Sequence, residues 1–495
     1  MSQERLSRGA GVLLPIFSLP SDYGIGTMGM AAYGFIDFLV AAGQKYWQVL
    51  PMGPTIFGDS PYQSPSAFAG NPYFIDINAL VRDGWLSRID KNLLYAEDPS
   101  RVDYARLYQT RHRVLRQSFE ESVGRLDHRF TQFCSDAAWW LDDYSLFATL
   151  KNEIGGGPWT DFPIDLREKR AHAILAYKEA HEREILYRKF VQYLFFSQWS
   201  RVRAYARERG IEIIGDLPIY LAFDSADVWA HRELFELDPD GFPSRVAGVP
   251  PDRFSSDGQL WGNPLYRWDV IERENFEFFR RRAQSAAELY DVLRIDHFIG
   301  FVNYYAISRG AATAREGCWN DVPYRGLFAA MEEAPLRFIA EDLGVLSPRV
   351  EQALSELGYP GMKILSFAFD SDRQNVNLPH HFTENTVVYG GTHDNEPLLS
   401  YFAAAPHSVL DFAADYLGVQ EKSPAVISEA IIRAGLQSRA DVAIFSLQDY
   451  LGMGSESRIN TPSVIGGNWL FRFGVGDFSE ALSERMQHLA EDAGR

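Results

Sequence analysis

Cysteine is scarce in this chain: its 495 residues include only Cys134 and Cys318. Two cysteines build neither a disulfide framework nor a zinc site of four cysteines, and this scarcity favours a reducing cytoplasm. Long apolar runs are missing as well, because no uninterrupted stretch approaches the ~18 residues of a membrane span. Near the amino terminus, Pro15 interrupts the first apolar stretch and no small-residue cleavage site follows, which argues against a signal peptide. We therefore expect a cytoplasmic protein.

Positive charge is also in short supply. The chain has 48 Lys and Arg against 66 Asp and Glu, which gives a formal net charge of -18. A nucleic-acid partner requires clustered Lys and Arg to neutralise phosphates, so nucleic-acid binding is not expected. The hydrophobic share of 46% and the charged share of 23% are those of an ordinary globular protein.

The motifs of several enzyme classes are absent or out of context. Gly24–Gly29 spells G-x-G-x-x-G, but residues 18–23 separate it from the preceding strand, and the next strand lacks a ribose-binding acid. We interpret it as a loop whose glycines need positive φ. His380 and His381 are adjacent, so they point in different directions, and no third metal ligand stands nearby. No serine lies in a G-x-S-x-G elbow. The sequence thus predicts neither cofactor nor metal.

Short apolar runs without polar alternation are plentiful. Such runs are typical of strands buried on both faces of a parallel sheet. Helical patterns lie between most of them, for example over Ile271–Tyr290, and this alternation predicts an α/β fold, a (β/α)8 TIM barrel. The eight candidate strands are Gly11–Phe17, Tyr46–Pro51, Glu212–Ile219, Val292–Phe298, Arg337–Leu343, Met362–Phe369, Thr386–Gly391 and Val442–Leu447.

The segment between the second and third candidate strands is too long for one crossover helix. Residues 79–209 are therefore expected to form an inserted, mainly helical subdomain. Apolar residues from Tyr187 to Tyr205 follow helical spacing, and Gly210 ends this pattern where a left-handed cap favours glycine. The aromatic stripe on this helix is interpreted as packing.

Two further segments complete the expected organisation. Residues 247–264 are rich in Pro and Gly and long for a turn, which predicts a lid loop over an active site. After the eighth strand there is room for a loop and one helix, residues 479–493, but not for a C-terminal β domain. Residues 1–495 are thus expected to form a single catalytic barrel unit.

Three of the candidate strands end on a carboxylic acid: Asp296, Glu341 and Asp394. Any one of them could cap the following helix. Catalytic groups of a barrel, however, lie at the carboxyl ends of its strands, where acids distant in sequence converge. Arg294 stands two residues before Asp296, so the two side chains face the same side of the strand.

This pattern indicates glycoside chemistry. A retaining reaction needs an ionised nucleophile and a protonated acid ~5 to 5.5 Å apart. Arg294 favours the ionised form of Asp296, which predicts the nucleophile, and the Asp296 charge is expected to keep Glu341 protonated. Asp394 would bind ring hydroxyls. Tyr62, after the second strand, either stacks on a sugar or packs into the core.

Seven motifs taken together resemble the 4-α-glucanotransferases of the amylomaltase (disproportionating enzyme) family. The resemblance covers nearly the whole chain. It implies the same barrel, and a retaining transfer of 1,4-α-glucan segments to the 4-hydroxyl of another glucan or glucose, without a metal. Maltooligosaccharides and α-1,4-glucans would be donors and acceptors. The motifs are GDSPYQSPSAFAGNP, GDLPIY, AGVPPD, GQLWGNPLYRW, LRIDHFIGF, IAEDLG and GTHDN.

The resemblance also implies residue roles. It makes Asp296 the nucleophile, Glu341 the acid/base and Asp394 the transition-state stabiliser. The chain departs from the family pattern at Phe57 and Arg253, where relatives often have tyrosine. Implied substrate-binding residues are Asp216, Arg294 and His393 with Ser60 and Tyr62 at the donor sugar, Gln259 and Trp261 in the lid, and Asp370 on the acceptor side.

Two alternatives remain open from the sequence. An α-glucan hydrolase related to α-amylase would use the same three acids, since only exclusion of water separates transfer from hydrolysis. A non-catalytic glucan-binding barrel is the second, although such proteins typically lose a catalytic acid.

Overall fold

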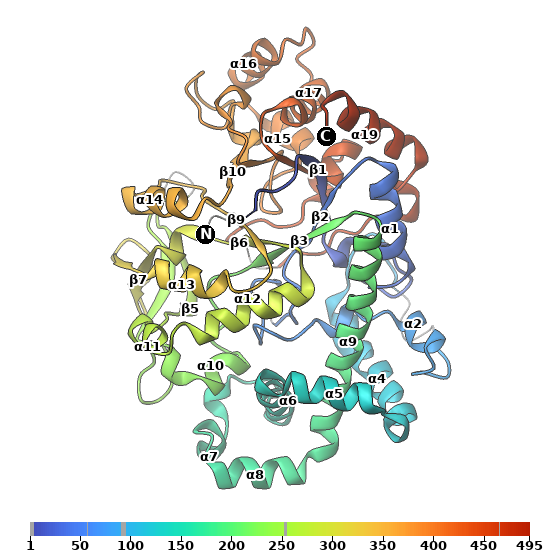
Figure 1. The fold of residues 1–495 in the computed structure, drawn as a ribbon, viewed down its shortest axis with the longest axis vertical. Coiled ribbons are helices and arrows are strands. Elements are labelled where there is room, and N and C mark those ends of the chain that lie inside the picture. The colour runs from blue at the N-terminus through green and yellow to red at the C-terminus, as the bar shows by residue number, and fades with distance from the viewer. Residues whose placement is uncertain (1–3, 57, 91–95, 252–254, 465) are drawn as a thin grey trace.

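The computed structural model describes residues 4–56, 58–90, 96–251, 255–464 and 466–495 (Figure 1). Eight parallel strands close into a barrel in the order β1-β12-β11-β10-β9-β6-β3-β2. The expected (β/α)8 fold is therefore confirmed. The barrel strands are β1 Gly9–Leu13, β2 Tyr46–Gln48, β3 Glu212–Leu217, β6 Val292–Ile295, β9 Arg337–Ala340, β10 Gly361–Ile364, β11 Thr386–Tyr389 and β12 Val442–Ser446.

The apolar strand runs fill both sides of the barrel wall. One cluster of buried side chains occupies the barrel interior and includes Tyr46, Ile214, Ile339 and Ile444. A second, larger cluster joins the outer face of the strands to the surrounding helices. Burial on both faces is why these strands lack the alternation of a half-exposed sheet.

Helices make up much of the chain outside the strands. In Figure 1, α4–α8 gather at one end of the molecule and the long α9 leads back to the barrel. Among the described residues between β2 and β3, the chain forms α2 and α4–α9, and α9 ends just before Gly210, whose φ is +73°. The helices are α1 Met30–Ala41, α2 Ile77–Arg82, α4 Tyr104–Ser122, α5 His128–Asp136, α6 Ala138–Glu153, α7 Ile164–Arg167, α8 Ala171–Ala180, α9 Glu182–Glu208, α10 Ala226–Ala230, α11 Trp268–Arg273, α12 Glu277–Leu289, α13 Tyr324–Met331, α14 Pro348–Leu357, α15 Leu398–Ala404, α16 His407–Leu417, α17 Pro424–Gln437, α18 Leu447–Leu451 and α19 Glu480–Asp492.

The single helix expected over Ile271–Tyr290 is wrong. The chain forms α11 and α12 instead, because Asn275 and Phe276 between them adopt left-handed conformations with φ of +52° and +58°. Phe276 remains buried, so the apolar spacing that suggested one helix reflects packing on both sides of the break.

A four-stranded antiparallel sheet was not predicted. Its order is β5-β4-β7-β8, with bounds Gln259–Pro264, Arg245–Val249, Asn303–Ser308 and Gly317–Asp321. The segment 247–264, expected as a loop, is thus a β-hairpin over much of its length, with β4 paired to β5. Phe57 and Arg253 lie outside the described residues.

The glycines of Gly24–Gly29 have two different roles. Gly24 has a φ of +77°, as expected, but no positive φ is found at Gly26 or Gly29. A Cβ at Gly26 would lie 1.9 Å from the Ile16 carbonyl oxygen, and one at Gly29 would lie 2.1 Å from Asp76 Oδ2. Close approach of neighbouring chain, rather than conformation, requires glycine at these two positions.

The segment that follows β12 carries α18, α19 and short 3-10 turns, and Phe471 makes an isolated bridge with Arg101. Among helices formed by described residues, none combines the length and apolarity needed to cross a bilayer.

Candidate active site

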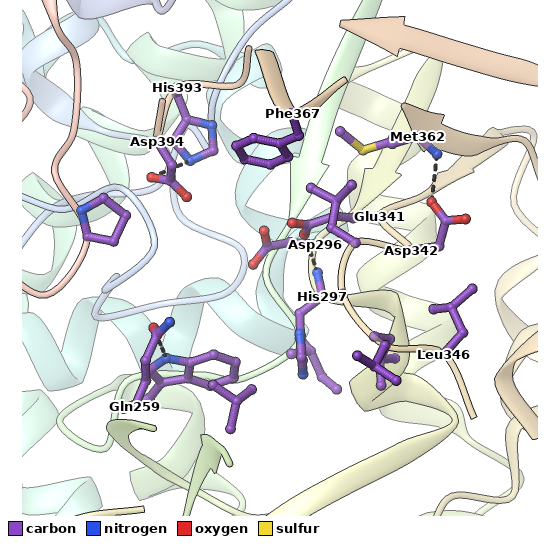
Figure 2. A pocket seen from close by; sticks show the side chains of 18 of the residues that line it. Gln259, Asp296, His297, Glu341, Asp342, Leu346, Met362, Phe367, His393 and Asp394 are labelled. Carbon is purple, nitrogen blue, oxygen red and sulfur yellow. Dashed lines mark hydrogen bonds and ion pairs between the residues drawn. The ribbon is translucent and has the colours of Figure 1, made fainter. Parts of the chain in front are cut away.

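A cavity of about 1340 Å³ opens at the carboxyl ends of the barrel strands. Asp296, Glu341 and Asp394 all line it, each directly after or near the end of its strand (Figure 2). Asp296 and Glu341 lie at the centre of the view, with Asp394 and His393 to one side. The barrel thus brings together three acids that are far apart in sequence.

Most of the other expected site residues line the same cavity: Ser60, Tyr62, Gln259, Trp261, Asp370 and His393. Asp216 and Arg294 do not line it. They lie beneath its floor, with side chains 0% and 3% exposed. The structure therefore places these two directly under the acids.

Arg294 connects the carboxylates of three neighbouring strands. Strand register puts Arg294 directly beside Asp216, and its Nη1 donates to Asp216 Oδ2 at 2.6 Å. The same nitrogen donates to Asp296 Oδ1 at 3.1 Å, as the two-residue spacing predicted. Nη2 lies 2.9 Å from Glu341 Oε2. One buried guanidinium thus holds both central acids in place.

The backbone also holds Glu341. The His297 N–H donates to Glu341 Oε2 at 2.6 Å, and His297 adopts a left-handed conformation with φ of +50°. The Phe298 N–H donates to the Glu341 carbonyl at 3.1 Å. The turn after β6 is therefore shaped around the acid at the end of β9.

The pKa shifts of the two central acids run opposite to the directions expected from the sequence. Burial and the neighbouring Glu341 raise the pKa of Asp296 well above its ordinary value. Burial also raises the pKa of Glu341, but Arg294 and the His297 N–H outweigh it and bring that pKa below its ordinary value. The sequence suggested the opposite because only the contact of Arg294 with Asp296 could be inferred. These shifts favour a proton on Asp296 over one on Glu341.

Tyr62 is half-buried against the site rather than in the core. Its ring stacks on His393 with centroids 5.0 Å apart and an interplanar angle of 14°. Its hydroxyl donates to Asp216 Oδ2 at 2.7 Å, and His393 Nε2 lies 3.4 Å from Asp394 Oδ1. Tyr62 therefore connects the buried Asp216 with the side of the cavity that carries Asp394.

The hairpin residues form the opposite wall. Trp261 packs edge-on against His297, with centroids 4.9 Å apart and planes at 90°. Its Nε1 donates to Gln259 Oε1 at 3.1 Å, a contact drawn in Figure 2. The hairpin is thus fixed to the residue that follows Asp296.

Asn460 is a site residue that the sequence reasoning missed. It lines the cavity, and its Nδ2 donates to Asp394 Oδ1 at 2.6 Å. Arg458 Nη2 donates to the Asp394 carbonyl at 2.9 Å. A weak sequence signal was available, because the polar residues Arg458 and Asn460 follow the last barrel strand and would lie near its carboxyl end, yet no spacing links them to Asp394.

The His380–His381 pair makes other contacts. His380 Nδ1 lies 2.8 Å from the Tyr416 hydroxyl, and His381 Nε2 lies 3.0 Å from the Arg373 carbonyl. Over the described ranges, no group of three or more His, Cys, Asp or Glu side chains is arranged to hold a metal ion.

Comparison with known proteins places this geometry in a family. A family model described as 4-alpha-glucanotransferase matches residues 14–476. The 4-alpha-glucanotransferase of Thermus thermophilus is 44% identical over 501 residues, 98% of this chain and 99% of the relative. That of Clostridium butyricum is 41% identical over 487 residues, 97% of this chain and 99% of the relative. An amylomaltase structure from Streptococcus agalactiae in complex with acarbose superposes with a TM-score of 0.94 at 39% identity, over 99% of both chains. The chain belongs to the 4-alpha-glucanotransferase family.

Proposed function

We propose that this enzyme moves a segment of a 1,4-α-glucan to the 4-hydroxyl of a second glucan or of glucose by a retaining double displacement. The observation that carries the proposal is the cluster of Arg294 with Asp296 and Glu341 on the floor of a cavity that Asp394 also lines. A retaining mechanism requires two neighbouring carboxyl groups, one as nucleophile and one as acid/base.

In the first step, an Asp296 oxygen attacks C1 of the donor sugar and the glycosidic C1–O bond breaks. The proton of the pair passes through Glu341 to the departing oxygen, which leaves as the 4-hydroxyl of the released segment. The proton that this step consumes comes from the carboxyl pair. A sugar bound between the carboxyl groups would separate them and leave Asp296 free to ionise beside Arg294.

In the second step, the 4-hydroxyl of the acceptor attacks C1, its proton moves to Glu341, and the bond from C1 to Asp296 breaks. Asp296 is neutral while it is an ester, so its repulsion of Glu341 disappears. Arg294 and the His297 N–H then stabilise ionised Glu341 as the base. One α-1,4 bond is broken and one is made, so the transfer needs no external energy source.

Asp394 is proposed to stabilise the positive charge that develops on the sugar ring, with His393 and Tyr62 beside it. The hairpin 247–264 is proposed to act as a lid. Gln259 and Trp261 line the cavity from this hairpin, and Pro462 and Trp469 line it from the segment after β12. Covering the ester on Asp296 would keep water away until an acceptor arrives.

Incubation with maltotriose tests the proposed function. The expected products are glucose and a ladder of longer maltodextrins, with nearly constant total reducing ends. A steady rise in reducing ends without a ladder would identify a hydrolase instead. Unchanged maltotriose would indicate a non-catalytic glucan-binding protein.

We expect Asp296→Asn to lower the transfer rate roughly a thousandfold or more, because loss of a nucleophile removes the covalent path. The amide keeps an oxygen that Arg294 can bond, so maltotriose binding by calorimetry should persist. Measured transfer close to that of the unaltered enzyme would remove Asp296 from this role.

A further inference from the structure

Trp319 is an exposed tryptophan on the wall of the active-site cavity. All eleven tryptophans of the chain lie among the described residues, and Trp319 alone is exposed, at 49%. It lines the same cavity as Asp296 and Glu341. A large aromatic surface left in water at a binding cavity is costly unless a ligand covers it.

The ring of Trp319 is held in place from one side. Trp319 on β8 is the direct cross-strand partner of Tyr305 on β7, and the two rings meet edge-on with centroids 5.2 Å apart. Tyr305 is buried, and its hydroxyl donates to the Ala314 carbonyl and accepts from the Gly317 N–H, both at 3.0 Å. A Cβ at Gly317 would lie 2.4 Å from the Tyr305 ring. The support under Trp319 is therefore closely packed, and the ring loses little conformational freedom when a ligand binds.

The β7–β8 hairpin is attached to the segment that follows Glu341. Ser347 Oγ donates to Asn303 Oδ1 at 3.1 Å, and Arg349 Nη2 donates to the Val322 carbonyl at 2.9 Å. Both Ser347 and Arg349 lie at the start of α14, close after the loop that carries Glu341. In Figure 2, Leu346 from this loop lies on the opposite side of Asp296 from Asp394. Trp319 therefore belongs to the acid/base side of the cavity.

We propose that Trp319 is a stacking platform for the acceptor glucan, beyond the sugar whose hydroxyl exchanges its proton with Glu341. The proposal rests on the proposed function. Glu341 contacts the bond between the donor sugar and the leaving or entering segment, so that segment extends on the Glu341 side. The apolar face of a pyranose covers an indole ring, and Glu351 on the same cavity wall offers a carboxylate to sugar hydroxyls.

The platform makes acceptor length matter. A single glucose occupies the position next to Glu341 and does not extend to Trp319, whereas a maltooligosaccharide does. The unaltered enzyme should therefore have a higher kcat/KM for a long acceptor than for glucose.

Labelled acceptors test this. Radiolabelled glucose and radiolabelled maltotetraose are offered with an unlabelled α-1,4-glucan donor, and kcat/KM for incorporation is measured. In Trp319→Ala, the kcat/KM for maltotetraose divided by the kcat/KM for glucose should fall roughly tenfold. This is the effect expected from the loss of one good aromatic contact. Trp319→Phe should keep most of the ratio, because an aromatic face remains. Val475→Ala, at a residue that is 80% exposed and outside the cavity lining, should leave the ratio as it was.

An unchanged ratio in Trp319→Ala would overturn the proposal, and so would an equal loss with both acceptors. A change confined to the preferred donor length would place the ring on the donor side and contradict the acceptor assignment. Failure of the proposed function would be recognised separately, because the unaltered enzyme would then form no transfer products with either acceptor.

Discussion

Asn460 is 66 residues away from Asp394 in sequence, yet its amide donates to the Asp394 carboxylate, which lines the cavity. Its backbone N–H donates to the His393 carbonyl at 3.2 Å. These two bonds fix both the main chain and the side chain of the loop after β11. Asn460 is thus a positioning residue for Asp394.

We expect Asn460→Ala to lower kcat roughly 10- to 100-fold, since a hydrogen bond to a charged group is worth about 1.5–3 kcal/mol. KM for maltotriose should change less, because the bond orients a group that acts mainly in the transition state. Steady-state kinetics measures both. The matched control is Asn385→Ala, which removes a 3.0 Å bond to the Gly358 carbonyl outside the cavity lining and should keep kcat. Equal losses in the two variants would contradict the role of Asn460.

At the residue scale, the sequence located the acids but not their surroundings. Asp296, Glu341 and Asp394 could be found because strand ends converge in a barrel. Their protonation could not, because it depends on Arg294 Nη2 reaching Glu341 and on the His297 N–H, contacts made only in the folded chain. Asn460 was missed for the same reason.

Asp449 joins two elements at the mouth of the barrel. It lies in α18, and its Oδ1 accepts the N–H of Leu398, the first residue of α15, at 2.8 Å. The loop that carries Asp394 leads into α15, so Asp449 anchors the far end of that loop. Burial raises the pKa of Asp449 to about 6.

This raised pKa means that the folded state binds the proton more tightly than the unfolded state. The stability that the protonated Asp449 carboxyl contributes to the folded state is fully present below the ordinary pKa of an aspartate, and it is lost as pH rises through about 6. Above that pH, the buried charge costs roughly 3 kcal/mol, from a pKa difference of about two. Asp449→Asn should therefore have a higher free energy of unfolding than the unaltered enzyme at pH 8, and the difference should shrink toward pH 4. Denaturant unfolding at both pH values measures this, and a less stable variant at pH 8 would be the contrary result.

Gly258 sets the shape of the proposed lid. Its φ is +68°, and a Cβ there would lie 2.4 Å from the Val249 carbonyl oxygen across the hairpin. We expect Gly258→Ala to distort the hairpin and to raise the share of turnovers that end in hydrolysis several-fold, because a left-handed alanine alone costs roughly 1–2 kcal/mol. Reducing ends per transfer event measure that share.

Gly418→Ala is the matched control for Gly258→Ala. Gly418 follows α16 with φ of +70°, and open space surrounds its Cβ position. Alanine at position 418 should cost a similar conformational free energy, and the share of turnovers that end in hydrolysis should stay unchanged. If both variants hydrolyse alike, the hairpin does not exclude water.

At the element scale, the barrel strands were predictable because burial on both faces leaves continuous apolar runs. The antiparallel sheet was not, because Gly317–Asp321 is exposed along most of its length and has no apolar period. The break between α11 and α12 was hidden because Phe276 is buried at the break itself. The spacing of apolar residues indicates which side chains are buried. Two separate helices can bury side chains at the same spacing as one continuous helix.

The helices between β2 and β3 share one core with the barrel. The largest cluster of buried side chains includes Phe190 and Trp199 of α9 together with Trp47 of β2 and Phe445 of β12. Trp199 also packs against Trp47 and donates from Nε1 to the Leu289 carbonyl at 2.9 Å. The stripe on α9 is thus a packing surface, as the sequence indicated, and what it packs against could not be inferred from its spacing.

Two glutamines of α9 bind the chain that follows the Tyr62 loop. Gln192 accepts the Gly70 N–H at 2.7 Å and donates to the Gly70 carbonyl at 3.0 Å. Gln198 makes the same pair of bonds to Asp76, at 2.7 and 3.1 Å. Both side chains are buried, so each satisfies backbone groups that water does not reach.

Because barrel and helices share this core, we expect one calorimetric unfolding transition. Gln192→Leu keeps the volume but leaves the Gly70 N–H and carbonyl unpaired, which should cost roughly 2–5 kcal/mol. The whole transition should move to lower temperature without splitting. Gln487 is an exposed glutamine of α19 whose side chain donates a hydrogen bond to Glu491. Gln487→Leu should therefore leave the midpoint unchanged. A separate early transition in Gln192→Leu would mean that the helices between β2 and β3 unfold on their own, and that the support of the Tyr62 loop is independent of the barrel.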